Sequence, residues 1–187
     1  MNHLSDEELV ARCARGDRRA MDTLVSRYHA KLLDFAFRHL GDRESSADIA
    51  QGTLVRVYER AGGYRLDATF KTWMYKIALN LIRDECRRRR ARRESLTSEL
   101  GIADLSAEIA PDSGSLPENA AMNAMVWQAL ERLPEERRSA VILKFRQGLT
   151  YVEIAKVMGA PVGTVKSWIY YALRSLRDVL DPEKSEV

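Results

Sequence analysis

Apolar side chains recur at spacings of three and four residues along most of the chain. Between residues 17 and 40, for example, Leu24, Tyr28, Leu32 and Phe35 follow this spacing. An α-helix brings such positions onto one face, whereas a half-buried strand alternates apolar and polar residues with a period of two. The sequence has no stretch of such alternation, so the pattern predicts an all-α fold.

Residues at the ends of these apolar runs predict where the N-terminal helices begin and end. Ser5 and Glu8 have the spacing of a capping box, so a first helix is expected to start there. Glycine often ends a helix because it readily adopts the left-handed conformation of a C-terminal cap. The next three helices are expected over residues 17–40, from Ser45 or Ser46 to Gly62-Gly63, and from Thr69 to Arg93.

Residues 94–118 interrupt the helical pattern. They contain two glycines and two prolines, with serines between them and no sustained apolar period, which is typical of a linker. We therefore expect two small helical domains, residues 1–93 and 119–187, joined by a flexible linker. Helices are expected again from Glu118 to about Leu180, with breaks at Pro134, Gln147-Gly148 and Gly159.

The most specific local pattern is G-L-T-Y-V-E-I-A-K-V-M-G-A-P, residues 148–161. Thr150 and Glu153 form a second capping box, which predicts the start of a short helix that Gly159 ends. Pro161 suits the first position of another helix, where its missing N–H costs nothing. Two helices joined by such a tight turn form a helix-turn-helix.

The second helix of this pair divides into two faces at 100° per residue. The apolar face is Val165, Ile169, Ala172, Leu176 and Leu180. The opposite face is small, polar or basic, and comprises Gly163, Lys166, Ser167, Tyr170 and Arg174. A recognition helix contacts bases with such a face near its N-terminus, which favours DNA binding. An ordinary helical hairpin with a solvated face remains the alternative.

The helix expected from Thr69 has a comparable division. One side holds Phe70, Trp73, Met74, Ile77, Ala78 and Leu81, and the other holds Thr72, Lys76, Asn80, Arg83 and Arg87. The second side is suited to DNA phosphates with an occasional base-edge contact. We expect Phe70 and Trp73 in the core, and Tyr75 to stack on an unstacked base. The arginines at the helix end could instead be merely solvated.

Charge is distributed unevenly along the chain. The net charge is +3, but residues 1–93 carry 20 basic and 13 acidic side chains, and residues 94–118 carry six acidic and no basic ones. Six arginines lie between residues 87 and 93. Clustered basic charge is typical of a nucleic-acid partner.

Several classes of protein are disfavoured by what the sequence lacks. Its apolar runs are too short for a membrane-spanning helix, and its acidic N-terminus is unlike a secretory signal. Cys13 and Cys86 are far apart, and His3, His29 and His39 have neither metal-ligand nor catalytic-triad spacing. We therefore expect a cytoplasmic protein with reduced cysteines and with no catalytic residues, metal or other cofactor, or small-molecule substrate. A single disulfide is the alternative for the cysteines.

Three long stretches together resemble a known family. They are ADIAQGTLVRVYERAGGYR (47–65), TFKTWMYKIALNLIRDECRRRR (69–90) and LERLPEERRSAVILKFRQGLTYVEIAKVMGAPVGTVKSWIYYALRSLR (130–177). The chain resembles bacterial RNA polymerase sigma factors of the extracytoplasmic-function (ECF) group. The resemblance implies a subunit that binds the beta-prime clamp and beta flap of core RNA polymerase and directs it to promoter DNA. It also implies inhibition by an anti-sigma protein.

The resemblance assigns roles to individual positions. It implies core-polymerase contacts at Asp48, Gln51, Leu54, Val55 and Tyr58. It implies minus-10 promoter contacts at Tyr64, Lys71, Thr72, Tyr75, Lys76, Asn80, Arg83 and Arg87. It implies minus-35 contacts at Thr150, Pro161, Gly163, Thr164, Lys166, Ser167, Tyr170 and Arg174. Gly52 departs from the family, in which many members have glutamate at this position.

The acidic linker also has an implied role. In the resembling family this segment passes through the RNA-exit path of the polymerase, where carboxylates stand in for RNA phosphates. A disordered, self-repelling tether is the alternative. For the whole chain, the alternative function is an autonomous helix-turn-helix regulator that binds DNA without polymerase. An enzyme such as a recombinase is disfavoured, because no acid, metal-ligand or basic cluster accompanies a candidate nucleophile.

Overall fold

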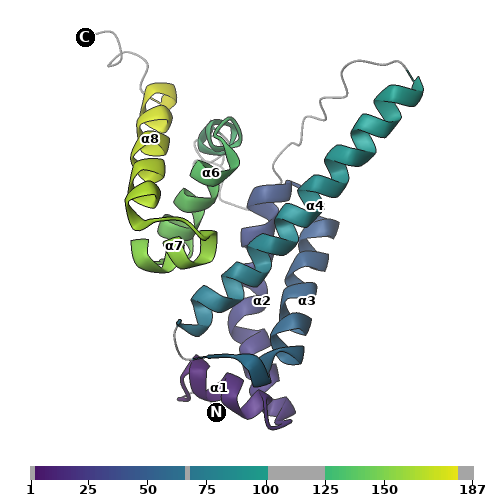
Figure 1. The fold of residues 1–187 in the computed structure, drawn as a ribbon, viewed down its shortest axis with the longest axis vertical. Coiled ribbons are helices and arrows are strands. Elements are labelled where there is room, and N and C mark those ends of the chain that lie inside the picture. The colour runs from purple at the N-terminus through teal and green to yellow at the C-terminus, as the bar shows by residue number, and fades with distance from the viewer. Residues whose placement is uncertain (1–2, 66–67, 101–124, 181–187) are drawn as a thin grey trace. The chain divides into compact units, whose positions relative to one another are not determined.

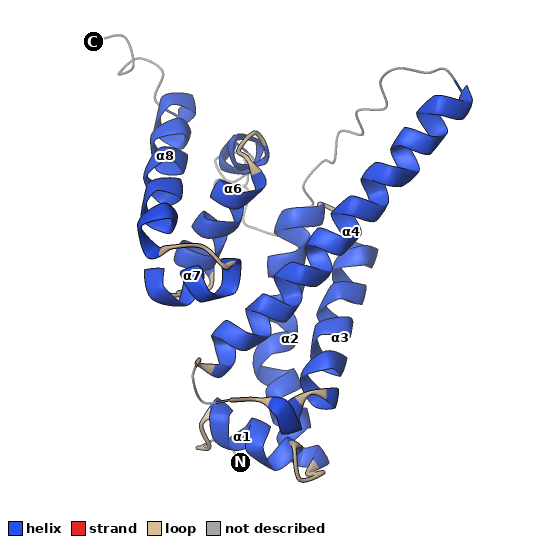
Figure 2. Cartoon of the chain, viewed as in Figure 1, coloured by secondary structure: helices blue, strands red, loops and turns tan. Residues whose placement is uncertain are grey.

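The computed structural model describes residues 3–65, 68–100 and 125–180. All regular structure in these ranges is helical, with no strand among them (Figure 2). The chain divides into two compact units, Met1–Ile109 and Ala110–Val187. The predicted all-α fold is therefore confirmed, and each unit is described by itself.

The described residues of the first unit form four α-helices and one 3-10 turn. These are α1 (Asp6–Cys13), α2 (Arg18–Leu40), α3 (Arg43–Glu59), η1 (Ala61–Gly63) and α4 (Phe70–Leu100). Helices α2 and α3 form an antiparallel pair, and α4 lies across both and projects beyond them (Figure 1). The short α1 packs against the start of α2 and against η1.

Side-chain caps explain most of the helix boundaries in this unit. The predicted capping box of Ser5 and Glu8 is present, and Gly41 ends α2 in the left-handed conformation with φ of 66°. The predicted start of α3 was two or three residues late, because Asp42 caps the helix by accepting from the backbone N–H groups of Glu44 and Ser45. Glycine does not end α3: the helix stops at Glu59, before the glycines of η1.

Helix α4 is longer than predicted. It begins at Phe70, one residue after the expected start, but continues to Leu100 instead of ending at Arg93. Residues 94–100 have no proline or glycine, and Glu94 forms an i,i+4 ion pair at 2.8 Å with Arg90, which supports the added turns. The predicted linker therefore begins with helix, and its residues 101–118 lie outside the described residues.

Aromatic rings fill the centre of the first unit. Phe35 of α2 contacts Tyr75 of α4 edge to face at 5.2 Å between ring centroids, and Tyr28 contacts Phe70 at 5.4 Å. All four rings are at most 3% exposed. Edge-to-face pairs of this kind add to the stabilisation from apolar burial, so α4 is fixed firmly on α2.

In the second unit the described residues start with helical residues 125–131, which four further elements follow. They are α6 (Glu135–Val141), the π-helical turn η2 (Ile142–Arg146), α7 (Tyr151–Met158) and α8 (Val162–Leu180). Helix α8 packs against α6 and α7 (Figure 1). Its Ala172 and Leu176 join Leu130, Leu133 and Val141 in the core.

The helix-turn-helix of α7 and α8 has the predicted capping box and turn glycine, but Pro161 does not occupy the first position of α8 as predicted. Thr150 and Glu153 form the capping box, and Gly159 ends α7 with φ of 67°. Pro161 immediately precedes α8 and its carbonyl accepts from the N–H of Val165 at 3.1 Å, so it lies just before the first helical position. The predicted breaks at Pro134 and Gly148 also occur, and Gly148 has φ of 72°.

Candidate nucleic-acid interface

The two faces of α8 lie as the sequence predicts. Val165, Ile169, Ala172 and Leu176 are at most 8% exposed and face the core of the second unit. The side chain of Leu180 lies outside the described residues. The opposite face reaches solvent at Gly163, Lys166, Ser167, Tyr170 and Arg174. Tyr170 is 63% exposed, so an aromatic ring and two cations share a surface that no core contact requires.

The N-terminal end of this face combines small and capping residues. Thr150 and Pro161 are exposed and Thr164 is partly exposed. Nothing lies within 4 Å of the position a Cβ would take at Gly163. The start of α8 is therefore open enough for a large ligand to approach its backbone.

Helix α4 also carries a continuous polar stripe. Lys71, Lys76, Asn80 and Arg87 are exposed, and Arg83 is half-buried. Trp73 is half-buried on the same side of the helix as Lys76 and Asn80, since residues three, four and seven positions apart share a face. The stripe presents cations, an amide and one aromatic ring.

Two predicted members of this stripe are in the core instead. Tyr75 is 1% exposed and lies against Phe35, and burial raises the pKa of its phenol well above the ordinary value. Thr72 is 2% exposed and its hydroxyl is hydrogen-bonded to that of Thr69 at 2.9 Å. The prediction that these two side chains contact DNA is therefore wrong for this structure, because neither reaches the surface.

Trp73 is the aromatic residue that the sequence reasoning misplaced in the core. Its ring is 5.1 Å from that of Tyr64, and the Tyr64 hydroxyl donates to the carbonyl of Ala68 at 2.7 Å. Trp73 and the half-buried Tyr64 thus form an accessible aromatic pair beside Lys76.

The arginine run at the end of α4 is not uniform. Arg89 donates to the carbonyl of Leu40 at 3.1 Å, to Asp42 at 2.7 Å and to Glu85 at 3.0 Å, so it joins α4 to the α2–α3 turn. Arg87 and Arg88 instead pair with acids one turn earlier on α4 and remain largely exposed. Only part of the cationic charge in this run is therefore structural.

A third surface lies on α3. Asp48 and Gln51 are exposed, Val55 is 47% exposed and Tyr58 is 43% exposed. Large apolar side chains on a charged helix face are typical of a protein contact site. Leu54 is 5% exposed and packs in the core, so its predicted contact with the polymerase is wrong for this conformation.

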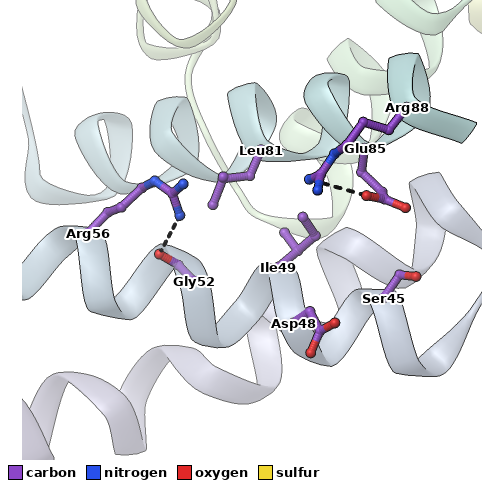
Figure 3. A pocket seen from close by; sticks show the side chains of 8 residues that line it. All are labelled: Ser45, Asp48, Ile49, Gly52, Arg56, Leu81, Glu85 and Arg88. Carbon is purple, nitrogen blue, oxygen red and sulfur yellow. Dashed lines mark hydrogen bonds and ion pairs between the residues drawn. The ribbon is translucent and has the colours of Figure 1, made fainter. Parts of the chain in front are cut away.

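Beside this surface is a cavity of about 230 Å³ between α3 and α4. Figure 3 shows Arg56 reaching back over Gly52, where its Nη1 donates to the glycine carbonyl at 3.3 Å. A Cβ at position 52 would lie 3.3 Å from that nitrogen and 3.7 Å from Leu81. The glycine thus leaves room for Arg56 to lie along the helix. The sequence shows that position 52 lacks a side chain, but it does not show that Arg56 uses the space.

Comparison with known proteins assigns the chain that carries these surfaces to a family. The family models described as "Sigma-70 region 2" and "Sigma-70, region 4" match residues 24–92 and 123–176. The RNA polymerase sigma-H factor of Pseudomonas aeruginosa is 36% identical over 184 residues, covering 95% of this chain and 94% of its own length. The ECF RNA polymerase sigma-E factor of Haemophilus influenzae is 30% identical over 186 residues, covering 96% of this chain and 97% of its own. The chain is an ECF sigma factor.

A solved structure supports the same assignment. CnrH, in complex with the cytosolic domain of CnrY, has a TM-score of 0.68 and 29% identity to this chain, and the match covers 95% of this chain and 97% of that one. A sigma factor is a non-enzymatic subunit of RNA polymerase that directs transcription initiation. The predicted function and the absence of catalysis are thereby confirmed.

The region 2 match of this sigma factor lies within the first unit, and the region 4 match within the second. Within the described ranges, none of the helices has the length and apolar character needed to span a bilayer. In the same ranges, histidine, cysteine and carboxylate side chains form no group that could hold a metal ion.

Proposed function

We propose that the two exposed cationic helix faces divide the promoter between them. The face of α4 engages the minus-10 element, and the face of α8 engages the minus-35 element in the major groove. The single observation that supports this division is that each unit has one helix with a fully formed core side and a cationic opposite side.

At the minus-10 element, the α4 stripe supplies two kinds of contact. Lys71, Lys76, Arg83 and Arg87 suit phosphates, and Asn80 can hydrogen-bond to an adenine edge. We assign base stacking to Trp73 and Tyr64. A base removed from the duplex loses a few kcal/mol of stacking and pairing, which an aromatic surface can partly replace.

At the minus-35 element, the start of α8 supplies the base-reading positions. Gly163 and Thr164 allow close approach of DNA, while Lys166, Ser167, Tyr170 and Arg174 follow along the exposed face. Thr150 and Pro161 flank the same edge of the helix-turn-helix. In this class of motif the N-terminal residues of the second helix contact base edges, and neighbouring groups contact phosphates.

The exposed part of α3 is the proposed docking site for the beta-prime clamp. Val55 and Tyr58 provide apolar contact area, and Asp48 and Gln51 provide polar contacts. A mixed face of this kind suits binding of one helix against another helical surface. Contact of the second unit with the beta flap follows from the family alone.

The acidic segment is proposed to follow the RNA-exit path of the polymerase. Residues 94–118 carry six carboxylates and no basic side chain, and most of them lie outside the described residues. Because residues 94–100 belong to α4, about 18 residues remain that could extend, to ~60 Å, and the seven helical residues add ~10 Å. The sum is close to the separation of two promoter elements about two helical turns apart.

An inhibitory protein partner and a cytoplasmic location complete the proposal. CnrH, similar along almost its whole length, forms a complex with the cytosolic domain of CnrY. In this chain the exposed Val55, Tyr58 and Tyr170 offer apolar surface that suits such a protein partner. A pull-down from stressed and unstressed cells that always recovers polymerase alone would contradict this partner.

The division of the promoter can be tested with reconstituted holoenzyme. The probe is a linear promoter selected from genomic DNA with that holoenzyme, read by run-off transcription and footprinting. Asn80→Ala should reduce protection and opening at the minus-10 element, and Arg174→Ala should reduce protection at the minus-35 element. Arg15→Ala, which removes an exposed cation outside both faces, is the control.

Two results would reject the proposal. If the purified chain protects both elements without polymerase and confers no start-site choice on it, the protein is an autonomous regulator. If Asn80→Ala and Arg174→Ala weaken the same element, the two helix faces do not divide the promoter.

A further inference from the structure

One tyrosine in the second unit has two ammonium groups beside its ring. The Nζ of Lys144, in η2, lies 4.7 Å from the ring centroid of Tyr151, and the Nζ of Lys166, in α8, lies 5.9 Å from it. Tyr151 is itself the first residue of α7. A single ring therefore joins three consecutive elements of the helix-turn-helix.

The backbone of Tyr151 is held in place by the cap of its helix. The backbone N–H of Thr150 donates to Glu153 at 2.8 Å, and the N–H of Glu153 donates to the Thr150 hydroxyl at 3.3 Å. Tyr151 lies between these two residues and is half-buried, whereas Lys166 is exposed. The backbone that carries the ring is thus fixed, whereas Lys166 extends from the surface of α8.

Bringing two ammonium groups near one point is unfavourable without a compensating attraction. The negative face of an aromatic ring attracts a cation within about 6 Å of its centroid, which restricts the otherwise mobile lysine side chain. Glu153, the nearest acid along α7, already serves the cap. The ring can therefore hold both lysines together without neutralising either, leaving their positive charge for an external anion.

We propose that Tyr151 is a positioning residue that presents Lys144 and Lys166 as a pair to one stretch of the DNA phosphate backbone at the minus-35 element. Lys144 thereby becomes a DNA-contact residue in addition to those assigned above. The proposal rests on the proposed role of α8. The occupant is DNA phosphate, because the pair offers six N–H donors, two positive charges and no acceptor.

Two simpler roles for Tyr151 must be separated from positioning. Its hydroxyl could itself donate to a phosphate, or its ring could serve only the packing of α7. Tyr151→Phe keeps the ring and removes the hydroxyl. Tyr151→Leu keeps an apolar side chain and removes the ring face that attracts the lysines.

The test measures binding of the holoenzyme to the selected duplex promoter at several salt concentrations. Tyr151→Leu should weaken binding about five- to tenfold and lower the slope of log K against log salt by about one, as for a lost phosphate contact. Tyr151→Phe should bind within about twofold of the unmodified holoenzyme. Equal weakening by both variants would assign the effect to the hydroxyl and overturn the proposal.

A double-mutant cycle distinguishes positioning from packing. In a chain that carries Lys144→Met and Lys166→Met, Tyr151→Leu should cause no further weakening, since the groups it positions are gone. A full additional loss in that background would overturn the proposal. Lys31→Met is the matched control, because Lys31 lies 5.3 Å from the Tyr28 ring in the other unit; it should not change binding.

An NMR measurement on the free chain needs no DNA. The ε-methylene protons of Lys144 and Lys166 should be shifted upfield by the ring, and Tyr151→Leu should abolish the shift. Absence of the shift overturns positioning.

If Lys166→Met leaves promoter binding unchanged, the role of α8 in the proposed function fails, and this proposal with it. If Lys166→Met weakens binding but Tyr151→Leu does not, only positioning is overturned.

Discussion

Glu7 of α1 accepts a hydrogen bond at 3.0 Å from the backbone N–H of Phe70, the first residue of α4 and 63 residues away along the chain. The first backbone N–H groups of a helix have no partner within it, so Glu7 caps α4 from another helix. Its neighbour Asp6 pairs with Arg27 at 2.8 Å and accepts from the Tyr28 hydroxyl. The acidic start of α1 therefore fixes the N-terminal end of α4 relative to α2.

Replacing Glu7 with alanine should loosen the start of α4. The Phe70 N–H would lose its acceptor in a part-buried place, which should cost about 1–2 kcal/mol. Hydrogen exchange by mass spectrometry should then be faster for α4 residues 70–74 than in the unmodified chain. Glu7→Gln, which keeps an acceptor oxygen, should show a smaller change; equal exchange in all three proteins would mean that the bond does not stabilise α4.

Removal of the Tyr75 ring should lower the stability of the fold, whereas removal of the Trp73 ring should lower promoter melting. Tyr75→Ala deletes a ring that is 1% exposed and should destabilise the first unit by about 3–5 kcal/mol. Trp73→Ala removes a half-buried ring and should leave the fold largely intact while reducing promoter melting. Thermal unfolding of the chain and permanganate footprinting of the holoenzyme measure the two effects. Normal melting by Trp73→Ala holoenzyme would exclude a stacking role.

The interchange of these two aromatic residues explains a limit of sequence reasoning. Helical period and caps predicted the fold class, the helix-turn-helix and the faces of α8, because α8 is buried on one side only. Helix α4 is buried over a wider arc, because Thr72, Tyr75, Leu79 and Ile82 are buried in addition to the predicted apolar side. Tyr75 and Thr72 fall inside that wider arc and Trp73 falls at its edge, which depends on tertiary packing.

Helix ends and contacts between elements differ in how far the sequence predicts them. Asp42 could have been recognised as the cap of α3, since aspartate is a favoured N-cap residue. The ring contacts of Tyr151, and the hydrogen bonds of Arg89 to the Leu40 carbonyl and to Asp42, could not, because these partners come from other elements. From the sequence, Arg89 is indistinguishable from the arginines beside it.

Asp42 should make the free energy of unfolding of the first unit depend on pH in the acidic range. Hydrogen bonds from the side chain and backbone of Ser45, and from Arg89, hold the pKa of Asp42 below its ordinary value of 3.8. Its stabilisation is therefore complete above the unfolded-state pKa and is lost as the pH falls through the lower folded-state pKa.

Asp42→Asn keeps an N-cap side chain but removes the titrating charge. In urea unfolding, the free energy of unfolding of the unmodified chain should exceed that of this variant by more at pH 7 than at pH 2.5. Asp22→Asn, at an exposed position of α2, is the control and should leave the acid dependence unchanged. If the difference in unfolding free energy between the unmodified chain and Asp42→Asn is the same at both pH values, the charge of Asp42 contributes nothing to stability.

Arg89 and Arg92 should separate the structural and DNA-binding parts of the arginine run. Arg89→Met removes the Arg89 donor from the Leu40 carbonyl and one of several donors from Asp42. It should destabilise the first unit by about 1–3 kcal/mol, with little change in the salt dependence of promoter binding. Arg92→Met, at an exposed position, should change stability by less than about 0.5 kcal/mol. It should lower the salt slope of holoenzyme binding by about one, as for one lost phosphate contact. Chemical unfolding and binding across a salt series measure both quantities, and the same salt slope for both variants would mean that the exposed arginines do not contact DNA.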